Sequence, residues 1–100
     1  MKSKCTIGSD GTKHWILNGK FHRVDGPAIE CVNGIKFWYI NGELHRTDGP
    51  AIEYLNGSKY WYFNGKEFTF NQWLSAVWDT LSKEDRKKYA FNGFEYKEEI

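Results

Sequence analysis

The sequence predicts a mostly β protein of the α+β class, in which an antiparallel meander of β-hairpin repeats is closed by one or two C-terminal helices. Residues 15–37 are repeated, with 14 identities in 23 positions, by residues 38–60, and residue pairs typical of hairpin turns recur at regular intervals. An apolar stripe at helical spacing follows the last repeat. We expect a single domain over 1–100: a hairpin array at 5–68, a helical cap at 69–91 and a tail at 92–100.

Turn residues divide the first two thirds of the chain into strands. Asn-Gly or Asp-Gly pairs occur at 10–11, 18–19, 33–34, 41–42, 56–57 and 64–65, with alternating spacings of 8 and 15 residues. Asn-Gly supplies the positive backbone angles of a two-residue type I′ turn, and β-branched and aromatic residues flank these pairs. The predicted strands are 5–9, 12–17, 20–22, 28–32, 35–40, 43–45, 51–55, 58–63 and 66–68.

Each full repeat also contains the hexapeptide His-Arg-x-Asp-Gly-Pro, at His22–Pro27 and His45–Pro50. Proline lacks an amide donor and favours an extended residue before it, whereas glycine tolerates unusual backbone angles. We expect each hexapeptide to form a corner between a short and a long strand, with the isomer of the Gly-Pro bond left open. The repeat residues to which we assign a structural role are Trp15, Trp38, Trp61, His22, His45, Asp25, Asp48, Gly26, Gly49, Pro27 and Pro50.

If every turn has two residues, the pairing separates the repeated tryptophans from most tyrosines. The first face then carries Trp15, Trp38, Trp61, Ile29, Ile52, Leu17, Ile40 and Phe63. The second face carries Ile16, Phe37, Tyr39, Tyr60, Tyr62, Phe21, Leu44, Val32 and Leu55. Both faces are apolar, so each needs a cover from the chain itself, a second copy or a partner.

The C-terminal third predicts helices that could supply one cover. The stripe has steps of 3, 1, 3, 1 and 3 residues and consists of Phe70, Trp73, Leu74, Val77, Trp78 and Leu81. Thr69 is placed to cap this helix, which we expect to lie across one face of the sheet, with the choice of face left open. Ser82–Asp85 resembles a capping box and predicts a second short helix to about residue 90, ended by 92–93. Residues 94–96 are expected to add a final strand.

Composition narrows the classes of function. The net charge is +1 with acids and bases interspersed, which disfavours binding to nucleic acid. No window approaches the length of a membrane span, and residues 1–5 lack the apolar run of a signal peptide, so we expect a cytoplasmic protein. Cys5 and Cys31 are not arranged as zinc ligands, and we expect free thiols, no metal and no cofactor.

The repeat resembles a known family. The segment Trp38–His45 reads W-Y-x-N-G-x-x-H and, with the repeat length of 23, is similar to the MORN repeat, a β-hairpin module. The chain departs from the usual H-G-x-G of that module at His45–Pro50. The fuller pattern H-R-x-D-G-P-A-x-E-x-x-N-G resembles small MORN-like repeat proteins of tailed bacteriophages. The resemblance covers about residues 7–68 and implies a non-catalytic, phage-encoded binding protein.

Only the corner residues look like candidates for chemistry. His22, Arg23, Asp25 and Glu30 recur as His45, Arg46, Asp48 and Glu53. A histidine beside a carboxylate can act as a general base, but this set occurs twice and has no nucleophile beside it. We therefore expect no enzyme activity and a structural role, in which each arginine pairs with its aspartate or reaches corner carbonyls. Two alternatives remain open: a metal shared by the two histidines, and an anionic ligand such as a nucleotide or phosphoinositide held by the arginines.

The functional hypothesis is a protein-binding module. Tyrosine and tryptophan dominate binding hot spots because they bury much area at small entropic cost. The candidate partner-binding residues are Phe37, Tyr39, Tyr60, Tyr62, Arg23 and Arg46. The expected partner is a bacterial protein, which a small phage inhibitor would block in the host cytoplasm. The alternative is a self-associating structural protein, such as a homodimer formed through an open sheet edge.

Overall fold

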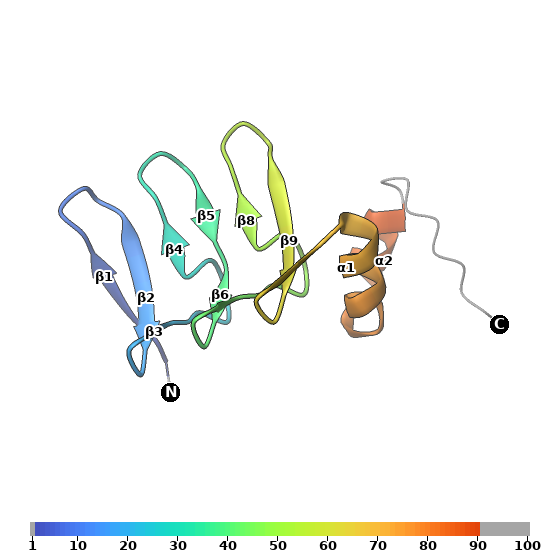
Figure 1. The fold of residues 1–100 in the computed structure, drawn as a ribbon, viewed down its shortest axis with the longest axis horizontal. Coiled ribbons are helices and arrows are strands. Elements are labelled where there is room, and N and C mark those ends of the chain that lie inside the picture. The colour runs from blue at the N-terminus through green and yellow to red at the C-terminus, as the bar shows by residue number, and fades with distance from the viewer. Residues whose placement is uncertain (1, 91–100) are drawn as a thin grey trace.

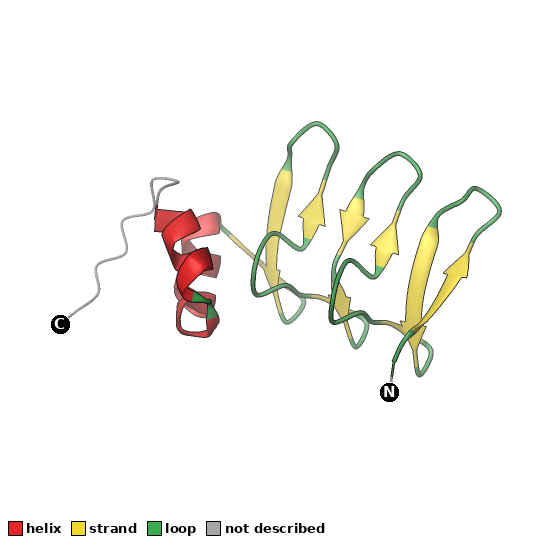
Figure 2. Ribbon diagram, turned by 180° about the vertical axis from the view of Figure 1, so that it is seen from behind, coloured by secondary structure: helices red, strands yellow, loops and turns green. Residues whose placement is uncertain are grey.

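A computed structural model describes residues 2–90, which form an antiparallel β meander followed by a short helical region (Figures 1 and 2). The hairpins stand side by side along the longest dimension of the protein, and the helices lie at the C-terminal end of this row. The strands are β1 (Lys4–Ile7), β2 (Lys13–Leu17), β3 (Lys20–Phe21), β4 (Ile29–Glu30), β5 (Lys36–Phe37), β6 (Tyr39–Ile40), β7 (Glu43–Leu44), β8 (Ile52–Glu53), β9 (Lys59–Phe63) and β10 (Lys66–Phe68). The predicted antiparallel α+β meander is confirmed.

The main sheet has the strand order β1-β2-β4-β5-β8-β9-β10, with β3 paired to β2, while β6 and β7 form a separate two-stranded ladder. Each repeat therefore has a long hairpin in the main sheet and a short hairpin at its base. The predicted strand 35–40 is interrupted at Trp38, where β5 gives way to β6, although the Trp38 amide donates to the Ala51 carbonyl at 2.7 Å. The chain thus leaves the long hairpin and enters the short one at the repeated tryptophan.

The turns are of two kinds. At the base, Asn18, Asn41 and Asn64 have φ near 50° and each is followed by a glycine with positive φ, as the predicted two-residue type I′ turn requires. At the tips, only the glycine has positive φ. The Gly34 amide donates to the Cys31 carbonyl, and the Cys31 amide donates to the Ile35 carbonyl, which closes a three-residue loop. The prediction of two-residue turns is wrong at all three tips.

The longer tip loops move the register by one residue, which reverses the facing of a strand. Ile29 pairs with Phe37, Phe37 with Ile52, and Ile52 with Tyr60. Ile29 and Ile52 therefore share the face of Phe37 and Tyr60, and their predicted place beside the tryptophans is wrong. At the base the predicted pairing is confirmed, since Ile16 pairs with Phe21 and Tyr39 with Leu44.

The helical region contains α1 (Phe70–Val77), the 3-10 helix η1 (Trp78–Thr80) and α2 (Lys83–Ala90). The Thr69 hydroxyl accepts from the Gln72 amide and the Gln72 side chain accepts from the Thr69 amide, so the predicted cap at Thr69 is confirmed as a capping box. The Ser82 hydroxyl accepts from the Asp85 amide at 3.1 Å and begins α2 as predicted. The expected helix end at 92–93 and strand at 94–96 lie outside the described residues. Within residues 2–90, no helix is long and apolar enough to cross a membrane.

The main apolar core lies between the helices and the last repeat rather than between two sheets. Its buried members are Trp73, Leu74, Val77, Trp78, Leu81 and Tyr89, packed against Trp61, Phe63, Phe68 and Phe70. Trp61 and Phe63 belong to the tryptophan side of β9. The helices therefore cap the end of the array on this side (Figure 1). The first helix, expected to lie across one face of the sheet, does so at the last hairpin, β9 and β10, without extending over the first two repeats.

Candidate functional site

Each corner arginine stacks on the tryptophan of its own repeat. The Arg23 guanidinium carbon lies 3.8 Å from the centroid of the Trp15 ring, and that of Arg46 lies 3.8 Å from the centroid of the Trp38 ring. A guanidinium over an aromatic face gains both quadrupole attraction and dispersion. In the first two repeats the arginine thus covers a tryptophan face that no helix reaches.

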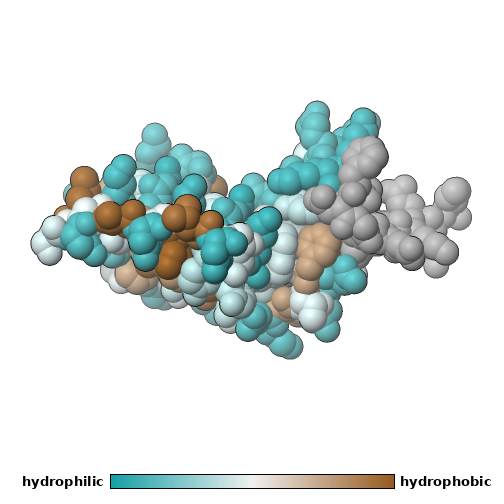
Figure 3. All heavy atoms as spheres, turned by 90° about the horizontal axis from the view of Figure 1, so that it is seen from above, coloured by the Kyte–Doolittle hydropathy of each residue, from teal (hydrophilic) through white to brown (hydrophobic). Residues whose placement is uncertain are grey.

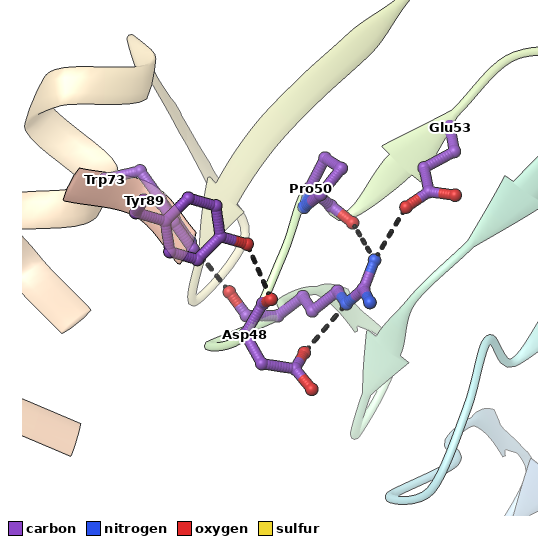
Figure 4. A network of polar contacts seen from close by, with 6 residues as sticks. Asp48, Pro50, Glu53, Trp73 and Tyr89 are labelled. Carbon is purple, nitrogen blue, oxygen red and sulfur yellow. Dashed lines mark hydrogen bonds and ion pairs between the residues drawn. The ribbon is translucent and has the colours of Figure 1, made fainter. Parts of the chain in front are cut away.

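The same guanidinium groups bind the backbone and carboxylates of their corners, as Figure 4 shows for the second corner. Arg46 Nε donates to Asp48 at 2.8 Å, and its Nη1 donates to the Pro50 carbonyl at 3.0 Å and to Glu53 at 2.9 Å. Arg23 repeats the first two contacts with Asp25 and Pro27, although its Nη1 lies 3.6 Å from Glu30. The guanidinium therefore ties the corner to the strand that follows it.

The corner glycines leave the space that the arginine guanidinium groups occupy. A Cβ on Gly49 would lie 2.5 Å from the Arg46 guanidinium carbon, and a Cβ on Gly26 would lie 2.8 Å from that of Arg23. Because the guanidinium is held by several bonds, it cannot swing aside without losing them. Both Gly-Pro bonds are trans, since residues 2–90 contain no cis peptide bond.

The corner histidines connect one repeat to the next. Nδ1 of His22 accepts from the Asn41 amide at 3.0 Å, and Nδ1 of His45 accepts from the Asn64 amide at 2.8 Å. The His45 ring also lies 4.8 Å from the ring of Phe63. An accepting Nδ1 must be unprotonated. Burial lowers the pKa of His45 below its ordinary value of 6.5, against a smaller opposing effect of Glu43.

This histidine predicts a loss of stability in mild acid. Because the pKa of His45 is lower in the folded protein than in the unfolded chain, the unfolded chain takes up the proton first as the pH falls through 6.5. We expect the melting temperature to fall between about pH 7 and pH 5. In His45→Gln, whose side-chain carbonyl can still accept, this fall should be smaller. Thermal unfolding followed by circular dichroism measures both, and an unchanged pH dependence in the variant would contradict the assignment.

The second corner also supports the helical cap. Trp73 Nε1 donates to the Arg46 carbonyl at 2.7 Å, and the Tyr89 hydroxyl donates to the Asp48 carbonyl at 2.7 Å (Figure 4). Burial raises the pKa of Tyr89 to about 12, so its hydroxyl stays a donor even in alkaline solution in which a free tyrosine ionises. The carbonyls of His45–Pro50 thus anchor the cap, while the side chain of Arg46 holds the array.

The opposite face of the sheet carries the aromatic candidates. Phe37, Tyr39 and Tyr62 are half-buried, and Tyr60 is exposed. Together with Tyr54, whose ring lies 5.6 Å from that of Tyr60, these residues define what we call the tyrosine face. Burial raises the pKa of Tyr62, and Glu67 and the other three tyrosines raise it further. Strand alternation turns Tyr60 and Tyr62 away from Trp61, against which the cap packs.

The tips of the hairpins extend this apolar surface. The exposed residues there include Ile7, Val32 and Leu55, and Figure 3 shows apolar side chains gathered over the hairpins. Leu55 lies beside Gly34 of the preceding tip and Val32 beside Gly11. Val32 and Leu55 are turn residues rather than members of a strand face, which corrects the sequence-based assignment.

Three grooves border the two corners on the tryptophan side, and one of them lies between the corners. The central groove has a volume of about 620 Å³ and is lined by Arg23, Val24, Asp25, Gly26, Trp38, Ile40, His45, Arg46, Thr47 and Asp48. The first groove, of about 350 Å³, contains Trp15 and Lys2 and shares the wall of Asp25. The third, of about 340 Å³, contains Trp61, Lys59 and Lys88 and shares the wall of Asp48.

The candidate residues therefore divide between two surfaces. Arg23 and Arg46 lie on the tryptophan side, and Phe37, Tyr39, Tyr60 and Tyr62 lie on the other. Nε and Nη1 of each arginine donate to its own corner, so of the three guanidinium nitrogens only Nη2 lies outside these hydrogen bonds. Among the described residues, no group of three His, Cys, Asp or Glu side chains could hold a metal ion.

Several contributors were not foreseen from the sequence. Tyr54 joins the tyrosine face, and Trp73 and Tyr89 bind corner carbonyls. The spacing of eight residues from Trp15 to Arg23, repeated from Trp38 to Arg46, is a signal for the stacked pairs. The contacts of Trp73 and Tyr89 have no local signal, because each spans 27 or more residues.

The fold and these surfaces define a hairpin-repeat protein with a helical cap and two differently built faces. No family model, curated protein or solved structure matches the chain. The resemblance to MORN-like phage repeats therefore stays a prediction.

Proposed function

We propose that the protein is a non-catalytic protein-binding module that docks on its partner through the tyrosine face. The observation that carries this proposal is the position of the helical cap, which packs on Trp61, Phe63 and Phe68 and leaves Tyr60 exposed. Half-buried tyrosines are held by their neighbours before binding, so docking costs little side-chain entropy. Their hydroxyl groups form hydrogen bonds with water in the free protein and with the partner in the complex.

The proposed mechanism is steric occlusion. In this proposal the tyrosine face and the apolar hairpin tips contact the partner together, and the repeat array presents them without rearrangement. If the resemblance to phage repeat proteins holds, the partner is a bacterial host or defence protein in the cytoplasm. The corner arginines contribute by keeping the hairpins in register rather than by touching the partner.

The test is capture of a partner from bacterial lysate with the tagged chain and with the double variant Tyr39→Ser and Tyr62→Ser. We expect the wild type to retain a specific protein that the double variant loses. The matched control is Val24→Ser, which removes an apolar side chain of 83% exposure on the corner side and should retain the partner. Equal capture by all three chains would contradict docking through the tyrosine face.

Self-association is a second candidate, favoured by the exposed strand β1 at the end of the sheet. Sheet order leaves the outer edge of β1 without a neighbouring strand in the part of the chain that is described, and such edges pair with other chains. Light scattering after size-exclusion chromatography separates the two candidates. A monomer favours docking on another protein, and a stable dimer that Thr6→Pro disrupts favours self-association.

A further inference from the structure

We propose a second binding surface, formed by the three grooves of the tryptophan side, whose ligand is an extended protein segment with the charge pattern acidic-x-x-basic-x-x-acidic in a polyproline II conformation. This surface lies on the opposite side from the tyrosine face and does not depend on docking there. The inference rests on the charge presented in each groove and on the distance between grooves.

The central groove presents negative charge. The side chains of Arg23 and Arg46 are 22% and 19% exposed and are held by their own corners, whereas those of Asp25 and Asp48 are 87% and 63% exposed. Each aspartate uses one oxygen for its arginine. The groove also contains the apolar side chain of Ile40 beside the Trp38 ring. A long basic side chain fits this combination, because its methylene groups pack on Ile40 and Trp38 while its charge meets the aspartates.

The outer grooves contain lysines, which the central groove lacks. Lys2 lines the first groove, and Lys59 and Lys88 line the third. Asp25 borders both the first and the central groove, and Asp48 both the central and the third. The other acid of the third groove, Glu53, is already paired with Arg46 at 2.9 Å. An acidic side chain can therefore pair with a lysine in each outer groove, so that lysines flank the two aspartates on both sides along the array.

The spacing selects the conformation of the ligand. Neighbouring grooves are one repeat apart, and each repeat adds two strands to the sheet, which amounts to about 9–10 Å. Three residues of a polyproline II helix span about 9.3 Å and return to the same face. Three residues of a β-strand span a similar length but point the third side chain to the opposite face. Only the polyproline II form places side chains i, i+3 and i+6 in successive grooves.

The test is an NMR titration of the whole chain, followed at the Trp38 indole N–H, with three peptides of identical composition. The designed core is Glu-Pro-Pro-Arg-Pro-Pro-Glu. The first control, Arg-Pro-Pro-Glu-Pro-Pro-Glu, changes the order of charges, and the second, Pro-Glu-Pro-Arg-Pro-Glu-Pro, changes their spacing. We expect the designed peptide to bind about tenfold more tightly than either control. Equal affinity for the three, or no binding of the designed peptide at millimolar concentration, would overturn the proposal.

Variants of the protein locate the site. Asp25→Asn with Asp48→Asn keeps the oxygens that accept from the arginines but removes both charges, and should weaken binding of the designed peptide about five- to tenfold. Lys88→Glu, a change at an exposed position in the third groove, should also weaken binding of the designed peptide when it is made alone. Asp79→Asn in η1 is the matched control, and the double variant Tyr39→Ser and Tyr62→Ser should bind the peptide like wild type. Unchanged affinity in both groove variants would refute the assignment.

Discussion

Replacement of Trp73 with alanine is expected to lower the free energy of unfolding by about 3–5 kcal/mol. The Trp73 side chain is fully buried at the centre of the cap. Its ring lies 4.5 Å from that of Trp61 and 5.6 Å from that of Tyr89. The change would leave a cavity at the junction and release the last repeat from the helices. Chemical denaturation followed by tryptophan fluorescence and circular dichroism measures the loss.

Trp73→Phe separates the two contributions of this residue. Phenylalanine keeps most of the ring contacts but cannot donate to the Arg46 carbonyl, which the indole does at 2.7 Å. We expect a loss of about 1–2 kcal/mol, intermediate between wild type and the alanine variant. A Trp73→Ala variant as stable as wild type would show that the cap does not stabilise the array.

Replacement of Arg46 with alanine is expected to lower the free energy of unfolding by about 2–3 kcal/mol. The variant loses the stack on Trp38 and leaves Glu53 and the Pro50 carbonyl without their donor. The value lies below that for a fully buried ion pair because Glu53 and Asp48 remain partly in contact with water. Arg46→Lys should recover little, since an ammonium cannot stack and form the planar set of bonds.

Arg23→Ala is the matched control for this experiment. Arg23 makes the same stack and the same bonds to its aspartate and proline carbonyl, but its distance to Glu30 is 3.6 Å and no helix covers its corner. We expect a loss of about 1–2 kcal/mol, smaller than for Arg46. Unchanged stability in Arg46→Ala together with loss of partner capture would assign the arginine to binding rather than to the fold.

The positions of the turns could be predicted from sequence, but their lengths could not. At the base, Asn41 itself adopts the left-handed conformation of a type I′ turn. At the tips, the side chains of Asn33 and Asn56 accept from the amides of Ile35 and Ser58, which stabilises a three-residue loop. The same dipeptide supports both geometries. The pairing of the flanking strands determines which turn forms. The length of that turn then determines the face of the sheet on which Ile29 and Ile52 lie.

The helices could be predicted more fully than their packing. The apolar stripe and Thr69 define α1 locally, because a capping box and a 3.6-residue period involve only near neighbours. The helix packs at the position that a corner of the third repeat would occupy. After Phe68 the chain has no His-Arg-x-Asp-Gly-Pro, and Phe70, Trp73 and Tyr89 take the place of the arginine over Trp61. The sequence does not show this replacement, because these aromatic residues come together over Trp61 only in the folded structure.

The two faces differ because repeated and non-repeated residues have different roles. The repeated polar residues hold the corners and the neighbouring hairpins together, so they recur because each repeat needs them for its own structure. Residues that differ between repeats, such as Cys31 and its counterpart Tyr54, shape the exposed surface instead. The proposed docking surface is therefore concentrated near the second and third hairpins, where the tyrosines gather.

The central claim is that the corner arginines are fixed structural elements stacked on the repeated tryptophans. NMR spectra of the arginine side chains test it most directly. The claim predicts separate Nε–H signals for Arg23 and Arg46 that exchange slowly with water, with side-chain protons shifted upfield by the rings 3.8 Å away. Averaged signals at the positions of a free arginine, with rapid exchange, would contradict it.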